Sequence, residues 1–231
     1  NDHANSLLWQ YVDDGTMPYG NNEDLTSDQI DLIASWIDEG ALETPAVDVT
    51  DLFFSEYAEG SSNNKYLEIY NSSGASVDLS AYSISTCNNG CDTANEFDYP
   101  ENVTFAAGTV LAAGDVYVVC HGSASDEISA ECDQTFTYLS NGDDFQALTL
   151  AGATASSYTV IDQVGDWGDD PGDGWDVAGV TDGTQEHTLV RKSNVTSGNT
   201  DWSASAGTNE SNSEWVVLDQ DTWDYLGSHP H

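Results

Sequence analysis

The pattern of apolar and polar residues divides the sequence into a helical segment over residues 1–43 and a longer part made of strands. Within the first segment, one short amphipathic helix is expected between residues 3 and 14. The apolar residues that recur there at helical spacing are Leu7, Leu8, Tyr11 and Val12. After them the chain runs through a polar loop that contains Met17 and Pro18.

A second helix in this segment has a complete start signal. Thr26 is expected to cap the helix and Gln29 to complete the capping box. Leu25 is placed to pack on Ile30, and Gly40 predicts the end of the helix. The apolar face comprises Ile30, Ile33 and Ile37, with Leu32 and Trp36 beside them. Two helices cannot enclose a core, so we expect them to pack on the rest of the chain, on an upstream segment or on a neighbouring subunit.

Residues 44–50 are predicted to be a short linker, after which the helical period disappears. Short runs rich in β-branched and aromatic residues then alternate with turns rich in Gly, Asn, Asp and Ser. This pattern is typical of an antiparallel β-sandwich, so residues 51–231 are predicted to form one. The predicted strands are residues 52–57, 66–70, 82–85, 116–120, 135–138, 147–150, 158–164, 187–190 and 214–218.

The charge of the chain is strongly unbalanced. Its 231 residues contain 41 Asp and Glu but 3 Lys and Arg, which gives a formal net charge of −38 at pH 7. Phosphate backbones are bound by clustered Lys and Arg, so direct nucleic-acid binding is not expected. No apolar run reaches the roughly 20 residues that cross a bilayer. Since so much negative charge repels itself unless ions screen it, we expect a saline extracellular environment, bound calcium, or both.

The four cysteines form two close pairs in the sequence, Cys87 with Cys91 and Cys120 with Cys132. Two short-loop disulfides are the simplest interpretation, and they indicate an oxidising compartment outside the cytoplasm. A zinc site with four thiolates is the alternative, although such sites usually have two residues between paired cysteines. The chain contains no Cys-x-x-Cys-His motif, so covalent haem attachment is not expected within it.

The densest acidic cluster lies within residues 165–176, and its carboxylates are Asp166, Asp169, Asp170, Asp173 and Asp176. Calcium takes six to eight oxygen ligands, which a Gly-rich acidic loop can supply, so we predict a calcium site here. The spacing differs from an EF-hand because Pro171 and Val180 occupy ligand positions. The alternative is a solvated turn above Trp167 and Trp175. Weaker candidates of the same kind are Asp92, Asp143 and Asp144.

Catalysis finds little support in the sequence. Paired carboxylates are uninformative in so acidic a chain, and neither Gly-x-Ser-x-Gly nor His-Glu-x-x-His occurs. His121 and His187 lie in or beside predicted strands, where hydrogen-bonded structural roles are usual. We therefore predict that the protein is not an enzyme, and we assign no catalytic residue.

Several segments of the predicted sandwich strongly resemble the bacterial lamin-tail-domain family: residues 51–71, 77–82, 113–119 and 226–229. The resemblance covers about residues 48–229 and implies an immunoglobulin-like β-sandwich. It also implies a secreted or surface location, sometimes as the accessory domain of an extracellular nuclease. Glu56 and Glu68 lie where the first strand pair of the family frames a turn, with Leu67 and Ile69 on the opposite side from Glu68. Membership of a fold family does not by itself define a function.

The helical segment resembles the carboxy-terminal half of a small c-type cytochrome domain. The resemblance rests on residues 6–12, on Met17 and Pro18, and on residues 25–41. It implies that Met17 would be the axial haem ligand, but the attachment motif would have to precede Asn1. Haem is therefore expected only if the native chain extends upstream. Otherwise Met17 is a loop residue with a buried thioether.

The leading hypothesis is an extracellular, non-enzymatic binding or structural module whose fold depends on cations. Its partner would be a protein or a surface, and a second copy of the chain is included, because the helical segment could drive assembly into a surface layer or filament. One alternative is an electron-transfer protein with haem bound upstream. Another is an accessory domain of a secreted nuclease.

Overall fold

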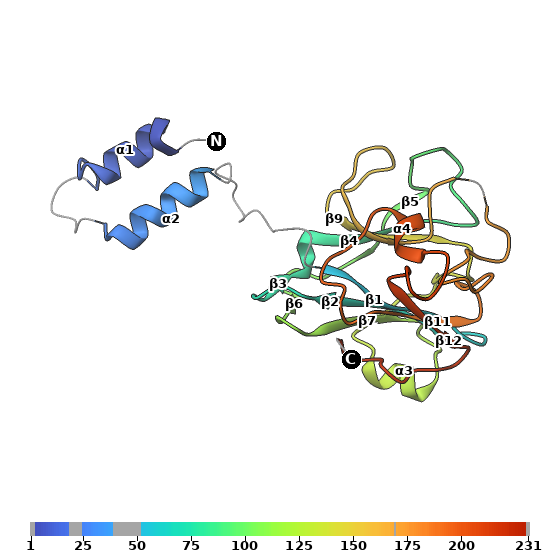
Figure 1. Ribbon diagram of the computed structural model, residues 1–231. Coiled ribbons are helices and arrows are strands. Elements are labelled where there is room, and N and C mark those ends of the chain that lie inside the picture. The colour runs from blue at the N-terminus through green and yellow to red at the C-terminus, as the bar shows by residue number, and fades with distance from the viewer. Residues whose placement is uncertain (1–2, 19–24, 39–51, 169, 230–231) are drawn as a thin grey trace. The chain divides into compact units, whose positions relative to one another are not determined.

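The computed structural model of the protein describes residues 3–18, 25–38, 52–168 and 170–229. The chain divides into two units, Asn1–Val49 and Thr50–His231, and each is considered by itself (Figure 1). The predicted linker and the predicted helix end at Gly40 lie outside the described residues.

The first unit contains a 3-10 turn, η1 (His3–Asn5), and two helices, α1 (Leu7–Asp13) and α2 (Ser27–Asp38). The predicted capping box is present at the start of α2. The amide of Thr26 donates to Gln29 Oε1 at 2.9 Å, and the amide of Gln29 donates to Thr26 Oγ1 at 3.3 Å. An ion pair of 2.6 Å between His3 Nδ1 and Asp38 Oδ2 joins the beginning of this unit to the end of α2.

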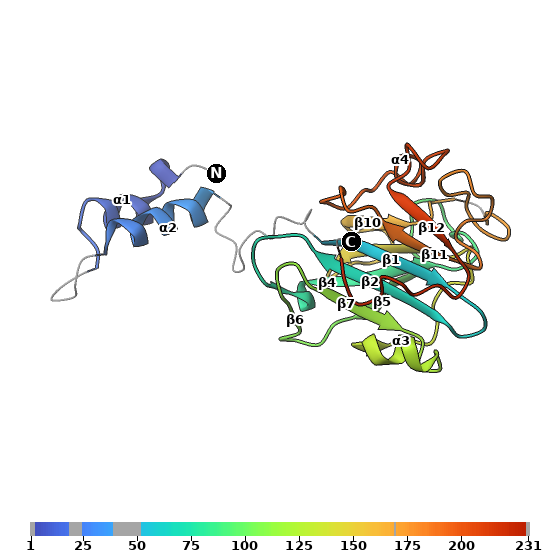
Figure 2. The same ribbon diagram turned by 60° about the horizontal axis from the view of Figure 1, so that its bottom comes forward.

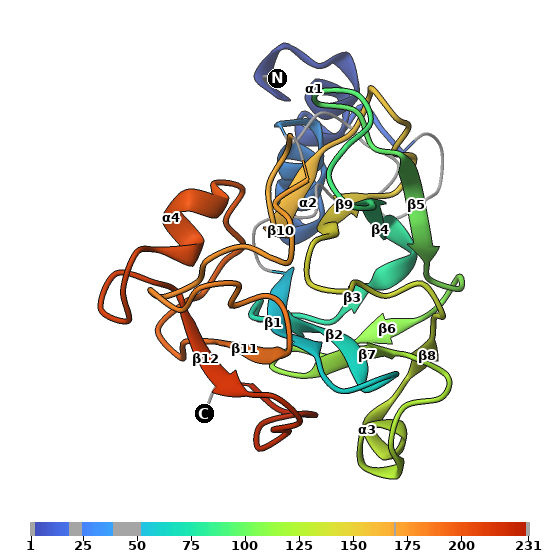
Figure 3. The same cartoon turned by 90° about the vertical axis from the view of Figure 1, so that its right-hand side faces the viewer.

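The second unit is a mainly antiparallel β-sandwich, which confirms the predicted fold class (Figures 1 and 3). One sheet has the order β12-β11-β1-β2-β7-β8, formed by β1 (Leu52–Glu59), β2 (Lys65–Asn71), β7 (Val116–Cys120), β8 (Gln134–Thr135), β11 (His187–Arg191) and β12 (Trp215–Asp219). The other has the order β10-β9-β4-β5, formed by β4 (Tyr82–Cys87), β5 (Tyr99–Thr104), β9 (Phe145–Leu150) and β10 (Val160–Val164). Short elements complete the unit: β3 (Val77–Asp78), η2 (Leu79–Ala81), β6 (Val110–Leu111), α3 (Asp126–Glu131) and α4 (Trp202–Ala206).

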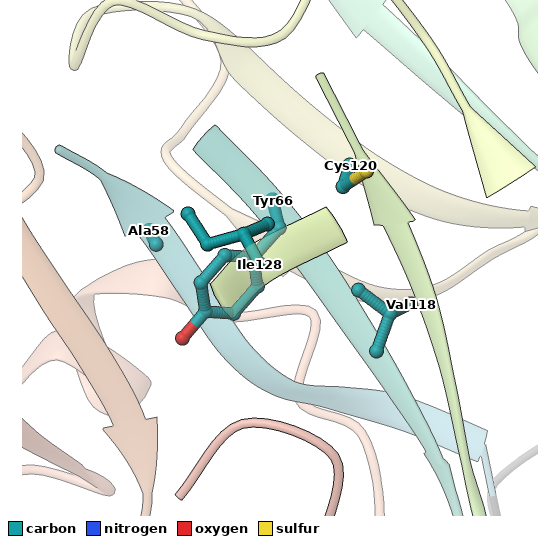
Figure 4. Packing of buried hydrophobic residues seen from close by; sticks show 5 residues of the cluster. All are labelled: Ala58, Tyr66, Val118, Cys120 and Ile128. Carbon is teal, nitrogen blue, oxygen red and sulfur yellow. The ribbon is translucent and has the colours of Figure 1, made fainter. Parts of the chain in front are cut away.

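The central strands of the six-stranded sheet are covered on both faces. Leu67 and Ile69 of β2 alternate with Tyr66 and Glu68, and all four side chains are buried. On the outer face, α3 lies beside β7 (Figure 2). Its Ile128 contacts a cluster that contains Ala58, Tyr66, Val118 and Cys120 (Figure 4). This cover explains why the sequence of β1 shows no alternation between apolar and polar residues.

The strand prediction was wrong in several places. The strand expected over residues 135–138 is limited to β8, and β3, β5 and β6 were not predicted. Pro100 lies in β5, and proline is tolerated there because β5 is the edge strand of its sheet. Glu101, the next residue, has a φ of 51°, which departs from regular strand geometry. For these reasons the sequence of β5 does not show the pattern of a regular strand.

Both predicted cysteine pairs are joined as disulfides. Cys87 at the end of β4 bonds to Cys91 with an S–S distance of 2.20 Å. Cys120 at the end of β7 bonds to Cys132, directly after α3, with an S–S distance of 2.06 Å. The second disulfide fixes α3 to the sheet that it covers.

Candidate functional site

The predicted calcium loop is not folded around a single point in the described residues. Asp166, Asp170 and Asp176 each accept a backbone N–H from nearby in the chain, with distances of 2.8, 2.7 and 3.1 Å. Asp169 lies outside the described residues. Among the residues that are described, no group of three or more His, Cys, Asp or Glu side chains is placed to hold a metal ion. The calcium prediction for this loop stays a prediction.

Aromatic rings pack beneath the acidic loop. The ring centroid of Trp167 lies 4.6 Å from that of Phe145, 4.7 Å from Phe97 and 5.3 Å from Tyr158. Trp175 contacts Trp202 edge-on at 6.5 Å. These contacts anchor the loop on the sandwich, as expected from its two tryptophans, whether or not an ion binds above them.

The turn before β9 brings two further carboxylates to the same loop. Gly142 has a φ of 109°, and a Cβ added there would lie 2.8 Å from the carbonyl oxygen of Asp173. This close approach requires glycine. Burial raises the pKa of the neighbouring Asp143, and the charges of Asp170 and Asp173 raise it further, whereas a backbone hydrogen bond and the charge of Lys65 lower it. Asp143 Oδ1 is buried and has no hydrogen-bond partner among the described residues. Asp144 instead accepts the amide of Asn89 at 2.9 Å.

A buried pair of carboxyl groups lies on the outer face of the six-stranded sheet. Glu56 on β1 and Glu68 on β2 are directly opposite each other, and neither is exposed to solvent. A β-bulge between Phe54 and Glu56 directs Ser55 to the same face, where Ser55 Oγ donates to Glu68 Oε1 at 2.7 Å. The amide of Gly227 donates to Glu68 Oε2, also at 2.7 Å.

The electrostatics of this pair favour the neutral acids. Tyr66 OH donates to Glu56 Oε2, whereas Glu56 Oε1 has no hydrogen-bond partner in the described part of the chain. Burial, with a further contribution from the charge of Glu68, raises the pKa of Glu56 to about 8. Burial also raises the pKa of Glu68 to about 7 against the effect of its hydrogen bonds. Both residues lie in the strands predicted for them, but no local pattern of the sequence indicates that they are buried.

The single arginine forms a second buried cluster, in which the carboxylates are paired with a cation. The guanidinium of Arg191 is fully buried between the sheets and pairs with Asp162 and Glu214, each at 2.6 Å. It also donates to the carbonyl of Phe54 at 3.2 Å and lies 3.9 Å from the ring centroid of Trp215. Because β10 carries Asp162 and β11 carries Arg191, this cluster ties the two sheets together.

The two lysines are also engaged in internal contacts. Lys65 Nζ pairs with Glu59 at 3.0 Å and donates to Ser140 O at 2.9 Å and Asn141 Oδ1 at 2.6 Å. Lys192 Nζ donates to the carbonyl of Ser213 at 2.7 Å. With Arg191 buried as well, all 3 basic side chains of the chain have intramolecular partners. They are therefore not clustered on the surface of the described residues.

Met17 lies after α1 and is half-buried, and its amide donates to the carbonyl of Tyr11 at 2.8 Å. Its role as a haem ligand stays a prediction. Within the described ranges, every helix is too short or too polar to cross a lipid bilayer.

Comparison with known families gives one result. The family model described as Lamin Tail Domain matches residues 45–169, just over half of the 231-residue chain. The match ends within the acidic loop, so β11, α4 and β12 lie beyond it. It begins after the helical segment, and the resemblance of that segment to a cytochrome is not borne out. The search of curated proteins found no match.

Proposed function

The chain belongs to the lamin tail domain family, and from this premise we propose that it acts outside the cell as a module that assembles with copies of itself. The family supports the coarser statement, namely a non-enzymatic structural or binding module with an immunoglobulin-like fold. Location, assembly and dependence on cations are parts of the proposal.

The extracellular location is supported by the two disulfides and by the charge. Structural disulfides persist in oxidising compartments and are rare in the cytosol. A net charge of −38 is best tolerated where the ionic strength is high, because salt shortens the range of repulsion.

The observation that carries the assembly proposal is the exposure of apolar side chains on the helical unit. Leu7 of α1 is 64% exposed and Leu32 of α2 is 70% exposed. Leu8, Tyr11 and Trp36 are also exposed by 39% or more. Apolar residues at this density on two short helices are typical of an interaction surface. A second copy of the chain is the proposed partner, since pairing of identical helical units would bury these residues symmetrically.

Light scattering after size-exclusion chromatography of the full chain tests this proposal. We expect a concentration-dependent increase in mass that the double variant Leu7→Ser, Leu32→Ser removes. The matched control is Val110→Ser, which changes an apolar residue of the sandwich that is 61% exposed. If the full chain is monomeric at all concentrations and salt levels, or if the control also removes assembly, the proposal is wrong.

A calcium site where the turn before β9 meets the acidic loop is the second part of the proposal. It is supported by the buried, unpartnered Asp143 Oδ1 and by the raised pKa of this group, which is caused mainly by burial and to which the charges of Asp170 and Asp173 add. A divalent cation would relieve this repulsion. We expect calcium to raise the melting temperature at constant ionic strength and EDTA to reverse the rise. Asp143→Asn should abolish the response, and an equal effect of sodium alone would indicate only general screening.

The remaining hypotheses make separate predictions. Electron transfer rests on Met17, and it predicts a Soret absorption band in protein purified from its native source. The nuclease-accessory hypothesis predicts that the chain has no nuclease activity until a catalytic partner is added.

A further inference from the structure

A polar hollow of about 230 Å³ opens on the surface of the sandwich where several loops meet. The turn between β1 and β2 contributes Asn63, the start of β2 contributes Lys65, and the loop after β4 contributes Asn88. His121 follows β7, and Tyr138 and Asn141 come from the segment between β8 and β9. The hollow therefore combines three amide side chains, one imidazole, one phenol ring and one ammonium group.

The ammonium group does not make this hollow an anion site. Lys65 Nζ has three N–H donors, and its three partners are Glu59 Oε1, Ser140 O and Asn141 Oδ1, at 2.6 to 3.0 Å. The charge of Lys65 is thus neutralised by a carboxylate, and no donor is left for a ligand. The net charge of −38 would also repel an anionic ligand at long range.

The hydrogen bonds around the hollow determine which groups face a ligand. Because Asn141 Oδ1 accepts from Lys65, the amide nitrogen of Asn141 can donate two hydrogen bonds. His121 Nδ1 accepts the amide of Ser123 at 3.0 Å, so the neutral ring carries its proton on Nε2, which becomes a donor. The exposed amides of Asn63 and Asn88 form no side-chain hydrogen bond with another described residue and can both donate and accept.

An aromatic ring lies beside these groups. Tyr138 is 73% exposed, the highest value among the large apolar and aromatic residues described. Its ring contacts Phe136 edge-on with a centroid distance of 6.0 Å. An aromatic ring presents an apolar body and a polar tip, so one that stands at the rim of a polar hollow suits a ligand with both kinds of surface.

We propose that this hollow binds an uncharged saccharide. The hydroxyl groups of a sugar each donate and accept hydrogen bonds, as do the amides of the hollow, and the C–H face of a sugar ring packs on an aromatic ring. Pockets for drug-sized ligands measure roughly 300–1,000 Å³, so the smaller hollow fits one or two sugar units of a glycan. This site is independent of the helical surface, so the two proposals can fail separately.

The test uses the full chain at constant ionic strength. Cellotetraose, laminaritetraose, mannotetraose and chitotetraose are titrated one by one, and binding is followed by the NMR amide signals of the protein. An alginate tetramer serves as the anionic comparison. We expect saturable binding of at least one neutral tetrasaccharide, with signal changes at Asn63, Asn88 and Asn141, and no binding of the alginate probe.

Two variants assign the binding to the hollow. Tyr138→Ala should weaken binding about tenfold or more, because it removes the exposed phenol ring of the hollow. Asn88→Ala should weaken it less. Both residues are exposed, so the fold should be retained, and the matched control Tyr99→Ala changes a tyrosine that is 49% exposed on β5. The proposal is overturned if no neutral probe binds, if the alginate tetramer binds best, or if Tyr138→Ala and Tyr99→Ala have equal effects.

Discussion

The cluster around Arg191 and the pair of Glu56 and Glu68 are two buried acidic regions of the same sandwich, and they differ in one respect. In both regions burial raises the pKa of a carboxyl group. For Asp162 the neighbouring charge is Arg191, which opposes the rise. For Glu56 the neighbouring charge is Glu68, which adds to it. The sign of the neighbouring charge therefore decides the state of a buried carboxyl group. Beside a cation it forms a stabilising ion pair, and beside another carboxyl group it stays protonated.

The largest loss of stability is expected when Arg191, the cation of the first region, is replaced by a neutral residue. Arg191→Met would leave Asp162 buried without its ion-pair partner, which costs about 3–5 kcal/mol of unfolding free energy. Urea denaturation at neutral pH measures this loss. Lys192→Met, one residue further along, is the matched control and should cost about 1 kcal/mol, because its ammonium group donates to backbone carbonyls at the edge of the fold.

A second change to this region checks the physical cause. If the cost of Arg191→Met arises from the charge left on Asp162, then adding Asp162→Asn should recover part of the lost stability. Equal stability of the single and double variants would mean that packing against Trp215, and not charge, is what Arg191 provides.

The next largest loss of stability is expected when the disulfide that fixes α3 over the second region is removed. Replacing both Cys120 and Cys132 by serine should cost about 3 kcal/mol, because the disulfide closes a loop with a sequence separation of 12. The same change at Cys87 and Cys91, with a separation of 4, should cost about 2 kcal/mol. The first double variant should also loosen α3 and admit water to Glu68, which the control should not do. Denaturation curves of the two variants at acidic and alkaline pH separate these effects.

Deprotonation of Glu56 and Glu68 is expected to lower the stability of the fold by a smaller amount. The ordinary pKa of both groups is 4.5, and in the folded protein it is raised to about 8 for Glu56 and about 7 for Glu68. The folded state therefore binds more protons than the unfolded state above pH 4.5, and stability falls as the pH rises through the folded values. We expect a loss on the order of 2 kcal/mol between about pH 7 and about pH 8.5.

Glu56→Gln isolates the contribution of the pair from that of the other titrating groups. The amide imitates the neutral acid and can still accept from Tyr66 OH, so the variant should be more stable than the native chain at alkaline pH and should show a flatter pH profile. Glu127→Gln, an exposed residue on α3, is the control and should follow the native profile. A native profile that is flat over this range would contradict the raised pKa values of the two groups.

The sequence was informative where the signal is local. The capping box at Thr26, the two cysteine pairs and most strands depend on residues close together in the chain, and all are present. The position of Glu56 and Glu68 was also predictable, but their burial was not.

Charged residues on the outer face of a sheet are normally solvated, and the cover comes from α3 and from Gly227, 159 residues beyond Glu68. Similarly, no local signal joins Arg191 to Asp162, because the pairing depends on the packing of two sheets. The polar hollow was not predictable either, since its residues come from several loops.

The smallest predicted effect distinguishes hydrogen bonding from charge in the second region. Ser55→Ala removes the donor to Glu68 Oε1 without adding volume, and Ser55 is fully buried. This hydrogen bond lowers the pKa of Glu68, so its loss should raise that pKa further. The variant should be less stable by about 1 kcal/mol at alkaline pH, where the carboxylate needs the donor, and by less at acidic pH.

Carboxyl NMR titration together with denaturation at both pH values measures the two effects. Ser80→Ala, at a half-buried position on η2, is the control and should leave the titration of Glu68 unchanged. If Ser55→Ala leaves it unchanged too, the hydrogen bond from Ser55 does not oppose the effect of burial on the pKa of Glu68, and this part of the interpretation is wrong.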